Sequence, residues 1–212
     1  MGKNKSWSVW FTSDLHIGHD SVIKFSQRPF KDSQEMSEYI REKWNLKVKP
    51  EDQVIVVGDV YFYLDKNQIK DYLSSLNGKK ILIRGNHDRK SREMYAIGFD
   101  LVCEEMSMTI ANERVTISHY PFRINKYKYL FYKIRHFLFN FLKIKGSWSE
   151  STKLYNKRPI DNGQFLIHGH THSKEKIKNK QIHVGMDAWN YEPVSLGEIG
   201  NIISKIKKEK EK

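Results

Sequence analysis

The segment Gln53-Val-Ile-Val-Val-Gly-Asp59 decides the predicted fold of this 212-residue chain. Four apolar residues, three of them valine, are followed by a glycine and then by a carboxylate. A short run of β-branched residues that is closed by glycine is typical of a buried strand. In layered α/β folds, functional side chains collect where strands end and loops begin. The segment therefore predicts a buried strand with Asp59 at a site beyond its carboxyl end.

The same arrangement recurs along the chain, because five apolar runs each stop at a residue that can bind metal. The runs are Val9–Ser13, Gln53–Val57, Lys80–Arg84, Arg114–Ser118 and Phe165–Ile167, and they end before Asp14, Gly58-Asp59, Gly85-Asn86, His119 and His168-Gly169-His170. Helical patterns separate the early runs, and hairpin patterns dominate later. This order predicts an α/β fold, a two-sheet β-sandwich flanked by helices.

Local patterns place the elements between these strands. Asp32 and Glu35 have the spacing of a capping box and predict a helix over Ser33–Lys47. Asp65 is the predicted cap of a second helix that continues to Leu76. Two hairpins are also predicted, Met106–Ile110 with Val115–Ser118, and Glu175 to Val184 with its turn near Asn179-Lys180.

The amino-acid composition restricts the kinds of protein that this chain can be. About 39% of the residues are hydrophobic, which is enough for a core in one domain, and the formal net charge of +12 indicates an anionic partner. No apolar run reaches the roughly 18 residues that a spanning helix needs, so we expect no transmembrane segment. The single cysteine, Cys103, lies in a strand-like segment, and we expect a buried thiol and a cytoplasmic protein.

Residues 122–160 interrupt the alternation of strands and helices. No acidic residue occurs between Arg114 and Ser149, although Lys and Arg are frequent there. One predicted helix face carries Leu130, Ile134, Phe137, Leu138, Phe141 and Leu142, and another carries Lys126, Lys133, His136, Asn140 and Lys143. The pattern predicts a basic amphipathic helix inserted into a single domain.

Three uses of this insertion compete. It could be a lid or groove wall that binds a nucleotide or nucleic acid through its basic and aromatic side chains. It could lie on an anionic membrane, as basic amphipathic helices do. It could instead form a homodimer, with its charges in solvent. Charge and aromatic content favour the first of these uses.

The polar residues at the strand ends are suited to bind metal. In an extended segment, Asp14 and His16 would point the same way and reach one ion. The carboxylate of Asp59 can bridge two cations. Asn86 offers an amide oxygen, and imidazoles come from His119, His170 and His172. Each motif alone also occurs in ordinary caps and turns, but their joint placement at successive strand ends indicates a metal site.

These elements together resemble the calcineurin-like metallophosphoesterases. The matching motifs are Asp14-Leu15-His16, Gly58-Asp59, Gly85-Asn86-His87-Asp88, His119 and Gly169-His170-Thr171-His172, in family order. The resemblance covers roughly residues 8–121 and 163–200. It is closest to small bacterial or phage members, because Ser13–His19, Arg28–Phe30 and Val184–Trp189 also match that subgroup.

The resemblance implies a two-metal site and assigns its residues. One ion would be held by Asp14, His16, Asp59 and His172, and the other by Asp59, Asn86, His119 and His170. Manganese is the first expectation, and iron, zinc, nickel and cobalt suit the same ligands. His87 matches the family's non-ligand histidine near the leaving group, and Asp88 would hold it in position.

Two further residues follow the first strand and are expected to contact substrate phosphate, His19 and Arg28. For Arg28, a structural salt bridge is an equal alternative. His168 is expected to make a hydrogen bond behind the ligands rather than to bind metal.

The implied activity is hydrolysis of a phosphodiester, in a nucleotide or nucleic acid, by a hydroxide that bridges the two metals. The alternatives are a phosphomonoesterase, a nucleotide pyrophosphatase, and a non-catalytic scaffold on the same fold. A scaffold could lose its ligands freely, whereas every implied ligand is present here. We therefore expect an enzyme.

Overall fold

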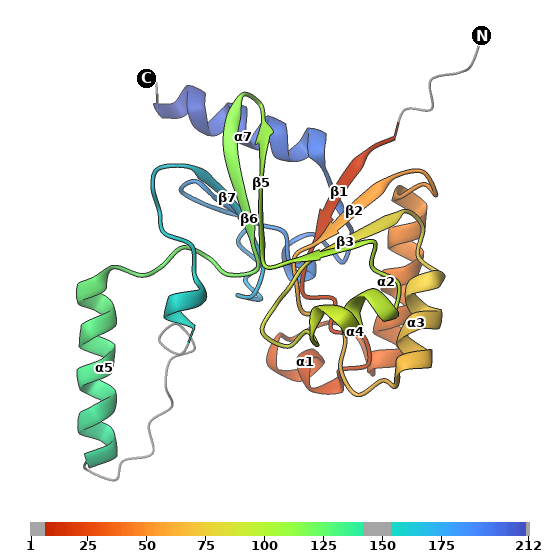
Figure 1. Ribbon diagram of the computed structural model, residues 1–212, viewed down its shortest axis with the longest axis horizontal. Coiled ribbons are helices and arrows are strands. Elements are labelled where there is room, and N and C mark those ends of the chain that lie inside the picture. The colour runs from red at the N-terminus through yellow and green to blue at the C-terminus, as the bar shows by residue number, and fades with distance from the viewer. Residues whose placement is uncertain (1–6, 142–153, 211–212) are drawn as a thin grey trace.

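The computed structural model describes residues 7–141 and 154–210 and contains two five-stranded sheets (Figure 1). The first sheet has the order β10-β1-β2-β3-β4, and the second β5-β6-β7-β9-β8. The first comprises β1 (Val9–Thr12), β2 (Gln53–Val56), β3 (Lys79–Ile83), β4 (Leu101–Cys103) and β10 (Val194–Ser195). The second comprises β5 (Glu105–Ile110), β6 (Glu113–Ser118), β7 (Phe165–His168), β8 (Ile177–Lys178) and β9 (Gln181–His183). The predicted two-sheet α/β sandwich is confirmed.

Helices cover the outer face of the first sheet. They are α1 (Asp20–Phe25), α2 (Ser33–Lys47), α3 (Lys66–Ser74) and α4 (Ser91–Ala96). α7 (Leu196–Lys210) follows β10 and packs beside the two sheets, while α5 (Lys126–Phe141) stands out from the body at one side. Two short 3-10 helices, η1 (Tyr155–Lys157) and η2 (Met186–Ala188), lie in loops.

The first sheet is buried on both faces, and β2 shows how. Val54 and Val56 pack with the helices in a cluster that contains Trp44. Ile55 and Val57 point the other way, into a cluster between the two sheets. Because successive strand residues alternate in direction, a strand covered on both faces is apolar throughout. This burial explains the continuous apolar run from which the fold was predicted.

The strand directions bring the predicted ligands together. β1, β2, β3 and β4 run parallel to one another, as do β6, β7 and β9 in the second sheet. The carboxyl ends of parallel strands lie at one edge of a sheet. The two edges also meet, because the His170 amide, which follows β7, donates to the Asp14 carboxylate, which follows β1.

Both predicted helices form at their predicted starts. α2 has the predicted bounds, and the Asp32 carboxylate accepts from the Glu35 amide at 2.8 Å. The Glu35 carboxylate, however, accepts from the Lys31 amide, one residue before the expected partner. In α3, Asp65 and Gln68 make the reciprocal capping box, and the helix ends two residues before the expected Leu76.

Both predicted hairpins are present. β5 and β6 are joined through Ala111 and Asn112, whose φ angles of 51° and 61° are those of a tight two-residue turn. β8 and β9 pair around the predicted Asn179-Lys180 turn. α1 and α4 were not predicted, because each has only six residues.

The insertion begins with a helix, as its periodicity predicted, and α5 covers Lys126 to Phe141. Its predicted positions Leu142 and Lys143 lie outside the described residues, as do all residues from 142 to 153. In the part of the chain described, no helix is both long and apolar enough to cross a bilayer.

Candidate metal centre

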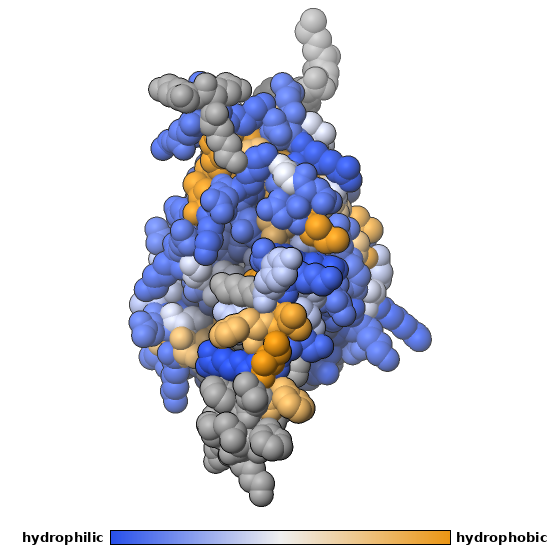
Figure 2. Space-filling model, turned by 90° about the vertical axis from the view of Figure 1, so that its left-hand side faces the viewer, coloured by the Kyte–Doolittle hydropathy of each residue, from blue (hydrophilic) through white to orange (hydrophobic). Residues whose placement is uncertain are grey.

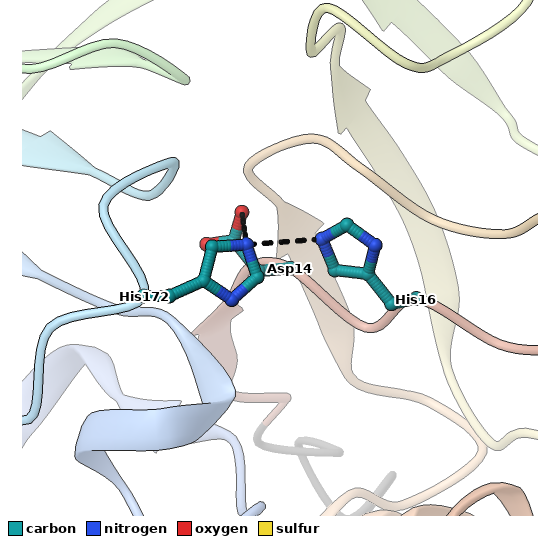
Figure 3. Close-up of side chains that lie close together, drawn as sticks. All are labelled: Asp14, His16 and His172. Carbon is teal, nitrogen blue, oxygen red and sulfur yellow. Dashed lines mark hydrogen bonds and ion pairs between the residues drawn. The ribbon is translucent and has the colours of Figure 1, made fainter. Parts of the chain in front are cut away.

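Two groups of ligating side chains lie where the two sheets meet. Asp14, His16 and His172 form one group, and Asp59, His119 and His170 form the other. Within each group the ligating atoms are all within 4.8 Å of one another. Figure 3 shows the first group, in which His16 and His172 point their rings at each other with Nε2 atoms 3.1 Å apart. The structure thus brings together residues that are up to 158 positions apart in the sequence, since Asp14 and His172 share one group.

Asp59 belongs to the second group and also faces the first. Its Oδ2 atom is 3.9 Å from Nε2 of His16 and 3.5 Å from Nε2 of His119. One carboxylate oxygen therefore faces both groups, as a bridging ligand must. Oδ1 of Asn86 lies 3.1 Å from the same His119 nitrogen, which places the expected amide ligand beside the second group.

The hydrogen bonds of His119 show that these donors suit a cation. Its Nδ1 atom lies 2.8 Å from the Val57 carbonyl oxygen, which only accepts, so Nδ1 carries the proton. In the neutral ring, the Nε2 lone pair then faces the oxygens of Asn86 and Asp59. Burial lowers the pKa of His119, but the Asp59 and Asp14 carboxylates and the Val57 carbonyl together outweigh burial and raise the pKa to about 9. Converging electron-rich atoms that attract a positive charge are what a metal site requires.

His172 is oriented by a residue that the sequence reasoning missed, Asp187. Nδ1 of His172 lies 3.1 Å from Oδ2 of Asp187, which leaves Nε2 directed at the first group. Carboxylates commonly orient metal-binding imidazoles in this way. Asp187 lies in the Val184–Trp189 segment, which resembles the family. That resemblance was the signal that could have identified this side chain.

Arg28 forms the salt bridge that the sequence left as the alternative to phosphate contact. Its Nε and Nη2 atoms donate to the two Asp187 oxygens at 2.9 and 2.8 Å. Nη2 and Nη1 also donate to the carbonyls of Asp14 and Leu15. The Arg28 side chain is fully buried, so its guanidinium supports the ligand loop and is not presented to a substrate.

His19 is buried beside the ligand His16. Its Nδ1 atom is 3.0 Å from Nδ1 of His16, and its ring stacks on Phe62 at 4.0 Å between centroids. Phe62 stacks on His16 as well, at 5.0 Å. Burial lowers the pKa of His19, so its ring is neutral near pH 7. These contacts suit a role for His19 in positioning His16, and the phosphate contact stays a prediction.

Five of the candidate ligands have left-handed backbone. The φ angles are 58° at Asp14, 53° at His16, 57° at Asp59, 71° at His170 and 49° at His172. Side chains other than glycine rarely adopt this region, and such strain concentrates at functional sites. The expectation that Asp14 and His16 belong to an extended segment is therefore wrong. Their amides bond to the Gly58 and Asp59 carbonyls, which curls the chain around the loop after β2.

His87 and Asp88 lie in the loop after β3, and their side chains make different contacts. The His87 ring is exposed, 6.3 Å from the His16 ring and 4.9 Å from that of Phe62. Asp88 instead accepts from the backbone amides of Asp59, Val60 and Gly85. The expected contact with the His87 ring is not among the Asp88 hydrogen bonds in residues 7–141 and 154–210. Asp88 thus joins the two loops that carry Asp59 and Asn86.

His168 makes a hydrogen bond behind the ligands, as expected. Its Nδ1 atom lies 2.9 Å from the Gly169 carbonyl oxygen, and its ring lies 5.3 Å from that of His183 on β9. Burial lowers the pKa of His168 to about 3 and that of His183 to about 4. Both rings are therefore neutral and belong to the packing beneath the centre.

We expect Gly58→Ala to weaken metal binding about 10–100-fold, the usual effect of disturbing a group that orients a ligand. A Cβ atom at Gly58 would lie 2.3 Å from Nδ1 of His119, so the ring must move. The left-handed backbone at this position, with φ of +86°, adds about 1–2 kcal/mol of strain. Titration calorimetry with Mn²⁺ measures the affinity.

Gly98→Ala is the matched control for this variant. Gly98 also has a left-handed φ, of +117°, but a Cβ atom there would meet nothing within 4 Å. Both variants should lose stability in urea unfolding, and only Gly58→Ala should lose metal affinity. Equal metal affinities in the two variants would contradict the assigned contact with His119.

Comparison with known proteins identifies the same family as the sequence motifs do. A profile of calcineurin-like phosphoesterases matches residues 8–194. The Gene 66 protein of Mycobacterium phage L5 is 31% identical, over 95% of this chain and 97% of that protein. The uncharacterized protein MJ1445 of Methanocaldococcus jannaschii is 28% identical, over 93% and 92% of the two chains. The crystal structure of AQ665 from Aquifex aeolicus, a protein of unknown function, is 26% identical, with a TM-score of 0.62 over 93% of this chain and all of that one.

Proposed function

Because the chain belongs to the calcineurin-like phosphoesterase family, we propose that it hydrolyses a phosphodiester, in a nucleotide or nucleic acid, with two divalent cations. The observation that carries this proposal is the position of Asp59. A single Oδ2 atom lies within 4 Å of histidine nitrogens from two separate ligand groups. That arrangement serves two ions that share a ligand, and an isolated ion would not need it.

We assign the donors to the two sets that the family resemblance implies. Asp14, His16, Asp59 and His172 would hold one ion, and Asp59, Asn86, His119 and His170 the other. Mixed nitrogen and oxygen donors fit Mn²⁺ first, with Fe, Zn, Ni and Co as alternatives. When bound, such ions lower the pKa of a water and offset the charge of phosphoryl oxygens.

His87 is the proposed general acid. Its ring is exposed at the edge of the centre, while its backbone amide donates to Oδ1 of Asp59 at 3.1 Å. A substrate can therefore reach the ring, and the backbone contact holds this part of the loop beside Asp59. From this position His87 would donate a proton to the leaving oxygen. Asp88 would act through the backbone, by holding the loops of Asp59 and Asn86 together.

Two observations support a diester over a monoester. A phosphomonoester carries about two negative charges near pH 7, whereas a diester carries one. The two residues predicted to contact phosphate bring no free positive charge to the centre. Arg28 is paired with Asp187, and the ring of His19 is neutral. A singly charged phosphate needs less cationic support from the chain.

Exposed aromatic rings at the rim of the centre support a nucleotide substrate. The Phe25 ring is exposed and lies 5.5 Å from the His172 ring. Tyr63, also exposed, lies 5.8 Å from the ring of His19. Nucleobases stack on such rings, and the net charge of +12 attracts polyanions.

A metal-by-substrate screen tests the proposal. The chain is stripped with EDTA and reloaded with Mn²⁺, Co²⁺, Ni²⁺, Zn²⁺ or Mg²⁺. Each form is assayed on bis-p-nitrophenyl phosphate, p-nitrophenyl phosphate, cyclic nucleotides, a dinucleoside pyrophosphate and short oligonucleotides. We expect turnover of the diester to exceed that of the monoester and to be highest with Mn²⁺.

The other outcomes identify the alternatives. Preference for p-nitrophenyl phosphate would indicate a phosphomonoesterase, and release of nucleoside monophosphate from a dinucleoside pyrophosphate would indicate a pyrophosphatase. Two bound ions without turnover on any substrate would indicate a scaffold.

The proposed organisation is one domain with an insertion at about residues 122–160. Support comes from the cluster between the sheets, in which Phe11 of the first sheet packs with Phe165 of the second. The single cysteine, Cys103, is free and suits the reducing cytoplasm, where we propose that the protein acts.

A further inference from the structure

α5 carries an exposed apolar face. Tyr127, Leu130, Phe131, Ile134 and Phe137 are between 52% and 83% exposed. Their spacings of three and four residues place them on one side of a helix. Figure 2 turns this side of the molecule to the viewer, and orange side chains gather there with blue ones beside them. Contiguous apolar surface of this kind marks a site of interaction.

The contacts at the start of α5 turn this face away from the body. Asn125 caps the helix by accepting from the Tyr127 amide at 2.8 Å. Tyr129 stacks on Tyr155 of η1, with ring centroids 3.9 Å apart and planes 16° apart. On an α-helix, positions five residues apart point about 140° from each other, so Ile134 is directed nearly opposite to Tyr129. The side of α5 that carries Tyr129 thus joins the protein at η1, and Ile134 is directed away from η1. In Figure 1, α5 stands apart from the two sheets.

Basic side chains border the apolar face. Lys133 and Arg135 immediately precede and follow Ile134, so they point about 100° to either side of it. Lys126 lies on the same border as Lys133. The chain has no acidic residue from Arg114 to Ser149, so α5 itself carries no negatively charged side chain. The occupant of this face must therefore be both apolar and negatively charged.

We propose that α5 docks flat on an anionic lipid bilayer. Its five exposed apolar side chains enter the boundary between headgroups and acyl chains, and its basic borders contact the lipid phosphates. A second copy of the chain fits less well, because two such helices would bring like charges together. A nucleic acid would pair with the charges but offers no hydrocarbon to Leu130 and Ile134. The proposal does not depend on the proposed hydrolytic activity.

Vesicle co-sedimentation of the full chain tests the proposal. One vesicle set is pure phosphatidylcholine, and the other has equal parts of phosphatidylcholine and phosphatidylglycerol. We expect binding to the anionic set, weakened by high salt, and little binding to the neutral set. Leu130→Gln with Ile134→Gln should lower the partition coefficient on anionic vesicles roughly tenfold or more. Glutamine keeps the helix propensity of the segment.

Two further variants make the result specific. Leu46→Gln on α2 is the matched control, because Leu46 is an isolated apolar residue that is 80% exposed, and it should bind as the unchanged chain does. Lys126→Gln with Lys133→Gln should abolish the preference for anionic vesicles. Circular dichroism and thermal melting verify that all variants remain folded.

Three results would overturn the proposal. The unchanged chain could fail to bind anionic vesicles, or the Leu130/Ile134 double variant could bind them as well as the unchanged chain does. The third is a loss of vesicle binding in Leu46→Gln as large as that in the double variant. Light scattering without vesicles and fluorescence polarisation with a labelled oligonucleotide are run in parallel. A dimer or an oligonucleotide complex that the Leu130/Ile134 variant alone loses would assign the face to that occupant instead.

Discussion

Asp59→Asn is expected to lower turnover about a thousandfold or more and to reduce the metal content at both positions. The loss of one charged ligand removes several kcal/mol of charge stabilisation, and each 1.36 kcal/mol corresponds to about tenfold in rate. In the native chain, Oδ2 of Asp59 faces His16 on one side and His119 on the other. An amide in its place is neutral and can turn N–H donors toward the cations. Metal binding at the two positions should therefore weaken together.

Metal content after dialysis and kcat/KM on bis-p-nitrophenyl phosphate measure this effect. Asp52→Asn is the matched control, because Asp52 and Asp59 are both 2% exposed and flank the two ends of β2. Asp52 accepts from the Ser8 amide and the Trp10 indole, at the end of β2 far from the ligands. Its variant should lose stability but keep its metals. Equal metal content in Asp59→Asn and the unchanged chain would exclude a bridging role.

His87→Ala is expected to keep both metals and to lose about 10²–10⁴-fold in turnover, the usual contribution of a general acid. The ring lies at the edge of the centre, and the structure groups other side chains as the candidate ligands. The loss should depend on the leaving group. An alkyl or nucleoside leaving group needs the proton, whereas p-nitrophenolate leaves readily without one.

The ratio of the two losses is the diagnostic measurement. Kinetics on bis-p-nitrophenyl phosphate and on a dinucleotide are compared for the variant and the unchanged chain, with metal content measured on the same samples. A smaller loss on the activated ester supports proton donation by His87. Equal losses on both substrates would point to charge stabilisation alone, and loss of metal would make His87 a ligand.

The local elements of the fold were predictable because short-range interactions determine them. The carboxylates of Asp32 and Asp65 cap helices that begin at the predicted residues. The apolar run that ends at Val57 forms a strand because both of its faces are buried. The short helices α1 and α4 escaped prediction, since six residues are too few to show a periodicity.

The convergence of the candidate ligands was predictable for a different reason. Parallel strands bring their carboxyl ends to one edge, so metal-binding side chains that each follow a strand converge without knowledge of the loops. The candidates Asp14, Asp59 and His119 could thus be chosen from the order of strands and polar residues along the sequence. The roles of Arg28 and His19 were not, because phosphate contact and structural support call for the same residue types.

The sequence by itself determined the strands, the capped helices, the order of candidate ligands and the amphipathic character of α5. Only the tertiary structure decided which groups face one another. Arg28 and Asp187 are 159 positions apart, and no local pattern could pair them. The left-handed backbone at Asp14 and His16 comes from hydrogen bonds to the distant loop after β2. The direction of the apolar face of α5 is likewise set by Tyr155, a residue beyond the helix. Such contacts join residues that are distant in the sequence and form only when the intervening chain has folded. No short segment is therefore enough to predict them.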